Sequence, residues 1–263
     1  MARPHSTYRT LAALVLLGVA VVVMALMGRW QLARADERLA LSDAIEAGRQ
    51  SAPVRLTAAM AGTDPALTAW QPAEAHGVWL ADKTVLLENR NHDGRPGYWI
   101  ATPMVLDEAG PAPRPAVLVL RGWMPRSLTA AGHPTPPPPS APRQTVKGEL
   151  ALHVPRLFEL GGGQYSRLPD RLGAAGQAVP AVQNLALDAY ARAAGLTMVP
   201  AVLQQIEPAD DGLVHDWPQP SIDYNQNRGY AIQWFAFAAI AAGAFIVVLY
   251  RAWRRRAGAS GPV

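Results

Sequence analysis

Residues 230–250 read YAIQWFAFAAIAAGAFIVVLY and contain no charged side chain. An α-helix of this length crosses the roughly 30 Å hydrocarbon core of a bilayer. Tyr230 and Trp234 at its start and Tyr250 at its end are typical of a membrane–water interface. A core helix of a soluble protein would carry a polar stripe, which this stretch lacks. We therefore predict a transmembrane helix over residues 230–250.

A second apolar stretch occupies residues 11–27. It is at the short end of the range for a membrane span, so a secretory signal peptide is the alternative interpretation. No small-x-small cleavage pattern follows it, because the next residues are Gly28, Arg29, Trp30 and Gln31. We therefore predict a first transmembrane helix over residues 11–27 that is retained in the protein.

Charge is distributed unevenly between the ends and the middle of the chain. All 20 acidic residues lie between Asp36 and Asp223, whereas the ends outside the two spans carry only basic side chains: Arg3, Arg9, Arg251, Arg254, Arg255 and Arg256. Lys and Arg beside membrane spans stay on the cytoplasmic side. Residues 1–10 and 251–263 are therefore expected in the cytoplasm. The domain over residues 28–229 is expected in the periplasm of a bacterium, with both helices in the inner membrane.

Composition narrows the chemistry of this central domain. The chain has no cysteine, which excludes disulfides, thiolate metal sites and a cysteine nucleophile. The net positive charge lies at the two ends, because the acidic residues of the middle offset its basic ones, so the nearly neutral middle offers no basic stripe for a nucleic acid. We therefore expect the lipid bilayer and other proteins as partners, and no nucleic acid.

The central domain alternates short apolar runs with turn residues, which predicts an α+β domain around a mainly antiparallel sheet, open or partly closed into a barrel. A helix should leave the first span and end near Gly48, and a second should cover residues 186–194 and stop at Gly195. Strands are expected at residues 53–58, 98–106, 117–123, 145–152, 182–185 and 199–206, and a hairpin from residues 78–80 and 83–90.

Three local features qualify this prediction. Pro103 should place the strand over residues 98–106 at a sheet edge or at a bulge. The run over residues 117–123 is continuously apolar up to Arg121 and should be the most buried strand. The proline-rich segment over residues 133–143 should be an exposed connector inside one sheet, and Gly161–Gly163 a loop without a phosphate-binding pattern.

Catalytic and metal-binding patterns are not found. The histidines are scattered and none stands at metal-ligand spacing, so each is expected at the surface or hydrogen-bonded: His5, His76, His92, His133, His153 and His215. The second span instead carries two small-xxx-small pairs, which allow close helix contact: Ala238 with Ala242 and Ala239 with Gly243. The sequence therefore predicts a protein that is not an enzyme and holds no metal.

Three motifs in a fixed order resemble the Surfeit locus 1 family. The first span is followed by Gly28-x-Trp30-Gln31-x-x-Arg34, and a central strand ends with Arg121-Gly122-Trp123-Met124-Pro125. The second span opens with Gly229-Tyr230-Ala231-x-Gln233-Trp234-Phe235. Two terminal spans around a β-rich domain are also the layout of that family, so the resemblance covers nearly the whole chain.

The resemblance implies a non-catalytic assembly factor for haem-copper cytochrome c oxidase. It would act with other assembly factors on subunit I as its haem a centre is built. The motif residues are then candidates for partner binding: Trp30, Gln31, Arg34, Arg121, Gly122, Tyr230, Gln233 and Trp234. Trp30 and Arg34 also suit simple anchoring at the membrane interface.

Haem a is the cofactor that the resemblance suggests. In bacterial members a histidine three residues before the tyrosine of the third motif is a proposed haem ligand, and Asn227 occupies that position here. An amide is a poor axial ligand for haem iron, which leaves Met24 or Met27 as weak alternatives. The alternative function is a membrane-tethered periplasmic scaffold or sensor that binds another protein.

Overall fold

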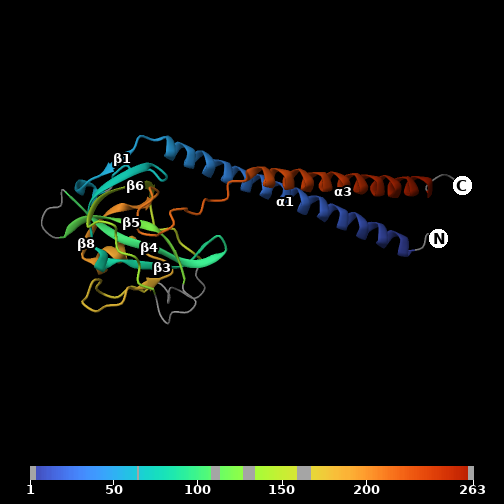
Figure 1. Ribbon diagram of the computed structural model, residues 1–263. Coiled ribbons are helices and arrows are strands. Elements are labelled where there is room, and N and C mark those ends of the chain that lie inside the picture. Colours follow the sequence, from blue (N-terminus) through green and yellow to red (C-terminus); the bar gives the residue numbers. More distant parts are fainter. Residues whose placement is uncertain (1–3, 64, 108–112, 127–133, 159–166, 260–263) are drawn as a thin grey trace. The chain divides into compact units, whose positions relative to one another are not determined.

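The computed structural model describes residues 4–63, 65–107, 113–126, 134–158 and 167–259. His133 and Gly161–Gly163 lie outside these residues. The chain forms two compact units: residues 1–43 with 220–263, and residues 44–219. The first unit contains the two long helices, and the second is the β-rich domain (Figure 1).

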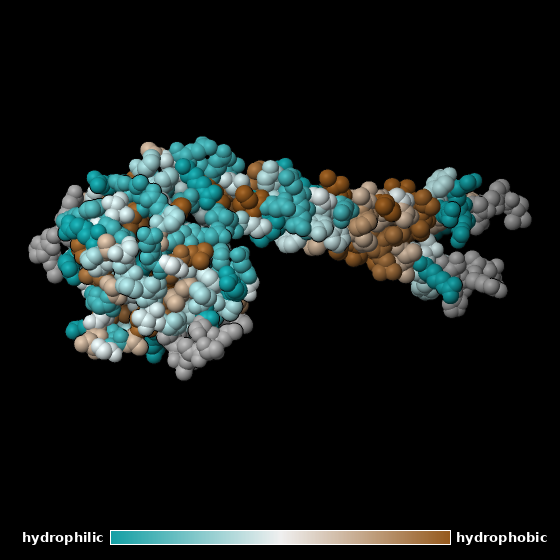
Figure 2. All heavy atoms as spheres, viewed as in Figure 1, coloured by the Kyte–Doolittle hydropathy of each residue, from teal (hydrophilic) through white to brown (hydrophobic). Residues whose placement is uncertain are grey.

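Two helices, α1 (Pro4–Gln50) and α3 (Tyr224–Ala259), are long and apolar enough to cross a membrane. Both extend beyond the predicted spans, because charged and polar helix formers continue the same backbone. α1 ends at Gln50, close to the helix end predicted near Gly48, and α3 begins before Tyr230. Figure 2 shows the apolar side chains as a band along both helices that ends in hydrophilic residues near the termini.

The helices pack antiparallel along a seam with alternating spacings of three and four residues, as in a coiled coil. On α3 the less exposed positions of the seam are residues 224, 227, 231, 234, 238, 241, 245 and 248. Ala238 and Ala241 are among them, whereas Ala239 and Gly243 are exposed. The predicted pair Ala239–Gly243 therefore does not contact α1, and an added Cβ at Gly243 would meet nothing within 4 Å.

The second unit is built on one eight-stranded sheet with the order β1-β2-β6-β8-β5-β4-β3-β7. An additional β2–β4 pairing closes β2, β6, β8, β5 and β4 into a ring, which we call the barrel. The strands are β1 (Val54–Leu56), β2 (Pro72–Trp79), β3 (Val85–His92), β4 (Arg95–Leu106), β5 (Arg114–Pro125), β6 (Arg143–Ala151), β7 (Ala181–Val182) and β8 (Leu196–Gln205).

Most pairings in this sheet are antiparallel, and β5–β8, β1–β2 and β3–β7 are parallel. One apolar cluster takes residues from every strand of the barrel and fills its interior; Val117 and Val119 are its contribution from β5. A second cluster contains Leu118 and Leu120 and packs beneath α2 (Leu187–Ala194). β5 is thus buried on both faces, and residues 117–123 are buried throughout. β4 is buried over a longer stretch, residues 97–106, so the prediction that residues 117–123 form the most buried strand is wrong.

The predicted hairpin between residues 78–80 and 83–90 is wrong. A short 3₁₀ turn, η2 (Ala81–Lys83), redirects the chain between β2 and β3, and each strand pairs with β4 instead of with the other. Because β2 and β3 both run antiparallel to β4, they run in the same direction, and the turn residues between them mark an interruption and not a reversal of the chain. The partner strand comes later in the sequence, so no local pattern could identify it.

Pro103 lies inside β4, a strand that has neighbours on both sides. Its position explains why proline is tolerated there. β3 pairs with β4 only as far as Ala101, and β2 pairs from Met104 onward, so Pro103 falls in the gap between the two neighbours. A residue without an N–H loses no ladder hydrogen bond at such a gap. The carbonyl of Pro103 accepts a hydrogen bond from the Leu80 N–H at 3.0 Å.

The proline-rich segment does not divide the domain. β6 follows it directly and pairs with β2 and β8, which confirms one sheet on both sides of the segment. Gly195 caps α2 in the left-handed conformation at φ 65°, as its position after the apolar helix predicted. Two further short elements complete the fold: η1 (Ala58–Met60) and the β7 strand at the edge beside β3.

Candidate functional site

The first and third motifs meet on the two helices. Gly28 lies on the α1 side of the seam and is buried. A Cβ at this position would come within 2.8 Å of the ring of Phe235 on α3. Any side chain at this position would force the Phe235 ring to move, so glycine allows the ring to approach the α1 backbone here. The two motifs therefore have complementary shapes: Gly28 of the first motif leaves a space, and the Phe235 ring of the third motif lies against it.

One turn further along α1, an amide pair links the helices. Asn227 donates a hydrogen bond from its Nδ2 to the Oε1 of Gln31 at 2.7 Å. The Asn227 Oδ1 atom is buried and has no hydrogen-bond partner among the described residues. A polar pair within an apolar seam fixes the register of two helices, because any slip leaves both amides unpaired.

Other residues of these motifs face outward from the helix pair. Trp30 is 54% exposed and Tyr230 is 45% exposed. Trp234 is half-buried and meets Phe237 edge to face at 6.3 Å between ring centroids, while Gln233 is exposed. Arg34 is also exposed and pairs with Glu37 at 2.7 Å within α1. An exposed Arg34–Glu37 pair contributes little stability, so these side chains are available to a partner or to lipid headgroups.

The second motif forms a β-bulge. Ile100 of β4 lies opposite Gly122 and Ala101 lies opposite Leu120, so Arg121 is the extra residue of β5. A bulge redirects the side chain of the extra residue and shifts the alternation after it. Trp123 consequently shares an apolar cluster with Leu120, although the two are three residues apart.

Arg121 is buried together with its acidic partner. Its Nη2 lies 2.6 Å from the Oδ2 of Asp211, and both side chains are 2% exposed. The guanidinium also donates to the carbonyl oxygens of Pro137 at 2.8 Å and Pro138 at 3.2 Å, and lies 5.7 Å from the Trp79 ring centroid. Burial lowers the pKa of Arg121, whereas the hydrogen bond and charge of Asp211 raise it. The arginine thus anchors the proline-rich segment, and its effect on any partner is indirect.

Gly122 lets another segment approach the bulge. A Cβ there would lie 2.7 Å from the Cβ of Leu213 and 3.0 Å from the Val214 carbonyl oxygen. Val214 and Trp123 exchange backbone hydrogen bonds of 2.7 and 2.9 Å. His215 then hydrogen-bonds to the backbone of Arg121, and burial lowers the pKa of this histidine. The second motif therefore connects β5 to residues 213–215 inside the domain.

A second buried arginine was missed by the sequence analysis. Arg90 is 3% exposed and its guanidinium lies 4.4 Å from the ring centroid of Trp99. It donates to the carbonyl oxygens of Pro155 at 2.9 Å and Gln183 at 3.0 Å, and no described carboxylate pairs with it. Burial lowers the pKa of Arg90 to about 10. It stands in an alternating strand sequence, where nothing distinguishes a buried arginine from a surface one.

The histidines whose side chains the structure describes are surface or hydrogen-bonded, as predicted. His76 lies 2.7 Å from Asp107 and 2.8 Å from the Thr145 hydroxyl. The ring centroids of His92 and Trp123 lie 5.1 Å apart, with the ring planes tilted by 45°. No group of three or more potential metal ligands occurs among the described residues. The side chains of His5 and His133 lie outside them.

The donor set around Asn227 does not fit a haem. The ligand position is an amide whose nitrogen is engaged with Gln31, and Gln31 opposite is itself an amide. Amides are not among the axial ligands that hold haem iron in proteins, which are His, Met, Cys and Tyr. We therefore derive no step in which the helix pair ligates haem.

A family model described as the SURF1 family matches residues 18–239. The chain belongs to the SURF1 family. The matched range includes all three motifs and the whole barrel, and it ends before the basic C-terminal part of α3. Membership confirms the resemblance drawn from those motifs, and the SURF1 family is associated with cytochrome c oxidase assembly. No curated protein matched the chain.

The buried ion pair gives a direct test of the second motif. Asp211→Asn keeps the shape and the acceptor for the Leu213 N–H but leaves the Arg121 charge buried without a carboxylate. We expect a loss of about 3 kcal/mol, or a drop of roughly 6–12 °C in the melting temperature of the domain. Near-UV circular dichroism of the full chain in detergent measures it. The adjacent, exposed Asp210→Asn is the control, and equal melting temperatures for the two variants would contradict the assigned role.

Proposed function

We propose that this chain is a non-catalytic assembly factor for haem-copper cytochrome c oxidase, which assists the maturation of subunit I and its haem a centre. The observation that carries the proposal is the match to the SURF1 family over residues 18–239. The packing of Gly28 against Phe235 and the Gln31–Asn227 hydrogen bond add physical support, since they bring two of the motifs into one helix pair.

The helix pair is the proposed contact for the oxidase subunit. Its seam is closed by small residues and by the amide pair, while Trp30, Tyr230 and Gln233 remain exposed beside it. Rigid aromatic and amide side chains on a fixed helix pair can pack and hydrogen-bond against another transmembrane helix. Arg34 lies about one helical turn after Trp30 on α1 and adds a positive charge beside it. In this proposal the chain holds subunit I, or a complex with other assembly factors, during cofactor insertion.

The amide at Asn227 bears on whether this chain carries haem a or holds the apoprotein that receives it. An assembly factor can act on a haem centre by holding the apoprotein open or by carrying the haem. Asn227 and Gln31 supply amides and no iron ligand, so the first role suits this chain better. The contribution of the chain is therefore the positioning of subunit I.

We further propose the bacterial inner membrane as the location, with both termini in the cytoplasm and the barrel in the periplasm. The six terminal arginines support this orientation, because basic residues beside spans stay in the cytoplasm. The lack of cysteine suits a periplasmic domain, where unpaired thiols are prone to oxidation.

The absence of cysteine also makes the topology easy to test. Ser140→Cys places a single thiol on the exposed part of the proline-rich segment, and Ala257→Cys places one at the end of α3. In spheroplasts a membrane-impermeant maleimide should label the first variant and reach the second only after lysis. The opposite pattern would overturn the orientation. Release of the protein by carbonate washing would overturn the two membrane spans themselves.

The contact residues are tested by complementation of a deletion strain. Trp30→Ala and Arg34→Gln should lower cytochrome c oxidase turnover several-fold at normal protein level, because each removes a side chain exposed beside the seam. Trp253→Ala and Arg29→Gln are the matched controls, since both are exposed and lie outside the proposed contact. Turnover is measured in membranes and protein level by immunoblot.

Each outcome of the complementation has a definite meaning. Full oxidase turnover in all four variants would remove these residues from the contact. Normal turnover in the deletion strain itself would contradict the assembly function and favour a membrane-tethered scaffold or sensor for another protein. An equal loss in variants and controls would indicate a general defect in membrane insertion.

A further inference from the structure

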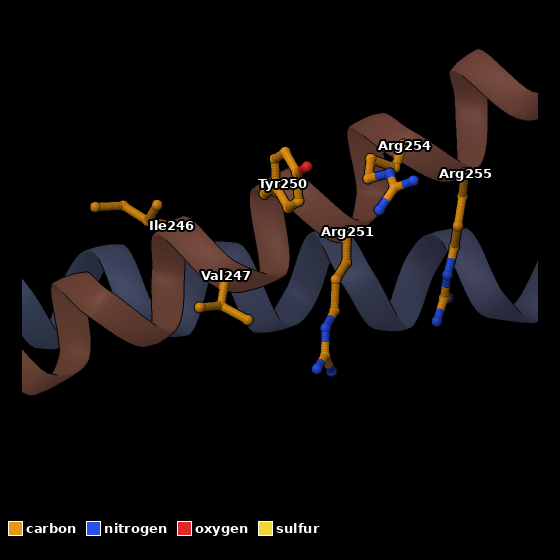
Figure 3. A pocket seen from close by; sticks show the side chains of 6 residues that line it. All are labelled: Ile246, Val247, Tyr250, Arg251, Arg254 and Arg255. Carbon is orange, nitrogen blue, oxygen red and sulfur yellow. The ribbon is translucent and has the colours of Figure 1, made fainter.

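The C-terminal part of α3 carries a groove outside the range matched by the SURF1 family. The groove has a volume of about 520 Å³ and is lined by Ile246, Val247, Tyr250, Arg251, Arg254 and Arg255. These residues form two rows at spacings of four, the first from Ile246 through Tyr250 to Arg254 and the second from Val247 through Arg251 to Arg255. Figure 3 shows Val247, Arg251 and Arg255 extending from the same side of the helix.

The groove lies on the face of α3 that is turned away from α1. Its lining residues are exposed, whereas Phe245, Val248 and Ala252 in the same stretch of α3 are half-buried. Phe245 reaches α1, because a Cβ at Gly18 would lie 3.8 Å from its ring. The groove is therefore not part of the helix seam and is open to the surroundings of the pair.

The charge in this groove is not neutralised within the described part of the protein. No ion pair is formed by Arg251, Arg254 or Arg255 there, and no acidic residue precedes Asp36 or follows Asp223 in the sequence. Arg254 lies 6.0 Å from the ring centroid of Tyr250, a contact that holds the guanidinium along the helix. Guanidinium groups bind phosphate in bidentate geometry, so three of them in one groove favour a phosphate-bearing ligand.

The order of side chains along the groove matches the order of groups in a phospholipid. Ile246 and Val247 offer apolar surface, Tyr250 follows with a phenol, and the arginines come last. A lipid presents acyl chains, then ester and glycerol oxygens, then phosphate over a comparable distance. Residues 246–255 of a helix span roughly 14 Å, which suits the boundary between hydrocarbon and headgroup.

We propose that the groove formed by residues 246, 247, 250, 251, 254 and 255 binds one anionic phospholipid, with its phosphate on the arginines and its acyl chains beside Ile246 and Val247. The inference rests on the proposal that α3 crosses the membrane. Carbonate washing tests that premise separately, so failure of either is distinguishable. A lipid held at this place anchors the cytoplasmic end of the helix pair at a defined depth.

The test uses the full chain, delipidated in detergent and titrated with dioleoyl-phosphatidylglycerol or dioleoyl-phosphatidylcholine. Native mass spectrometry counts the bound lipids. The wild-type chain should retain one phosphatidylglycerol with about tenfold preference over phosphatidylcholine, since each basic residue near the headgroup favours the anionic lipid. Arg251→Gln/Arg254→Gln should abolish that preference. Arg9→Gln/Arg256→Gln removes the same charge and should keep it.

Three results would overturn the proposal. Equal retention of both lipids by the wild-type chain would leave the arginines to another partner, such as an acidic protein segment. An equal loss of preference in both double variants would show diffuse attraction with no defined site. Displacement of phosphatidylglycerol by inorganic phosphate at the same concentration would reduce the groove to a bare anion site, because phosphate gains nothing from Ile246 and Val247.

Discussion

Closure of the barrel depends on β4 pairing with two different strands along one edge. β3 covers this edge up to Ala101 and β2 covers it from Met104, with Pro103 at the change of partner. The closed ring gives the domain an apolar interior, and it leaves β5 with one face inside the ring and one beneath α2. The bulge at Arg121 lies on this strand, which is covered on both faces, so the Arg121 guanidinium is buried. A buried charge requires polar partners, and here these are Asp211 and two proline carbonyl oxygens.

The two units divide the work that the proposed function requires. The β-rich domain contains two buried arginines, Arg90 and Arg121, that donate to backbone carbonyls and lie against aromatic rings, and so hold the segments around Pro155 and Pro137 in place. The helix pair carries the exposed aromatic and amide residues beside a seam that admits no side chain at Gly28. The side chains that the helix pair exposes differ along its length. An apolar contact surface lies near Phe235, and the arginine-lined groove lies at the C-terminal end of α3.

The sequence predicts those elements that depend on neighbouring residues alone. The apolar runs over residues 11–27 and 230–250, the twice-buried β5 and the glycine stop of α2 all follow from composition and spacing. The β2–β3 hairpin was mispredicted because both strands take β4 as partner, and pairing between distant segments leaves no local signal. For the same reason, the sequence does not predict the Gln31–Asn227 hydrogen bond or the burial of Arg121 and Arg90. Each depends on contacts with residues that are distant in the sequence.

In the proposed function, this chain serves the maturation of an a-type haem centre in a haem-copper oxidase. A reduced-minus-oxidised absorption spectrum of membranes from a deletion strain, compared with its parent, tests this claim most directly. We expect the a-type haem band to be lost or strongly reduced while b-type bands remain, and the intact gene to restore it. An unchanged a-type band together with normal oxidase turnover would exclude this role for the chain.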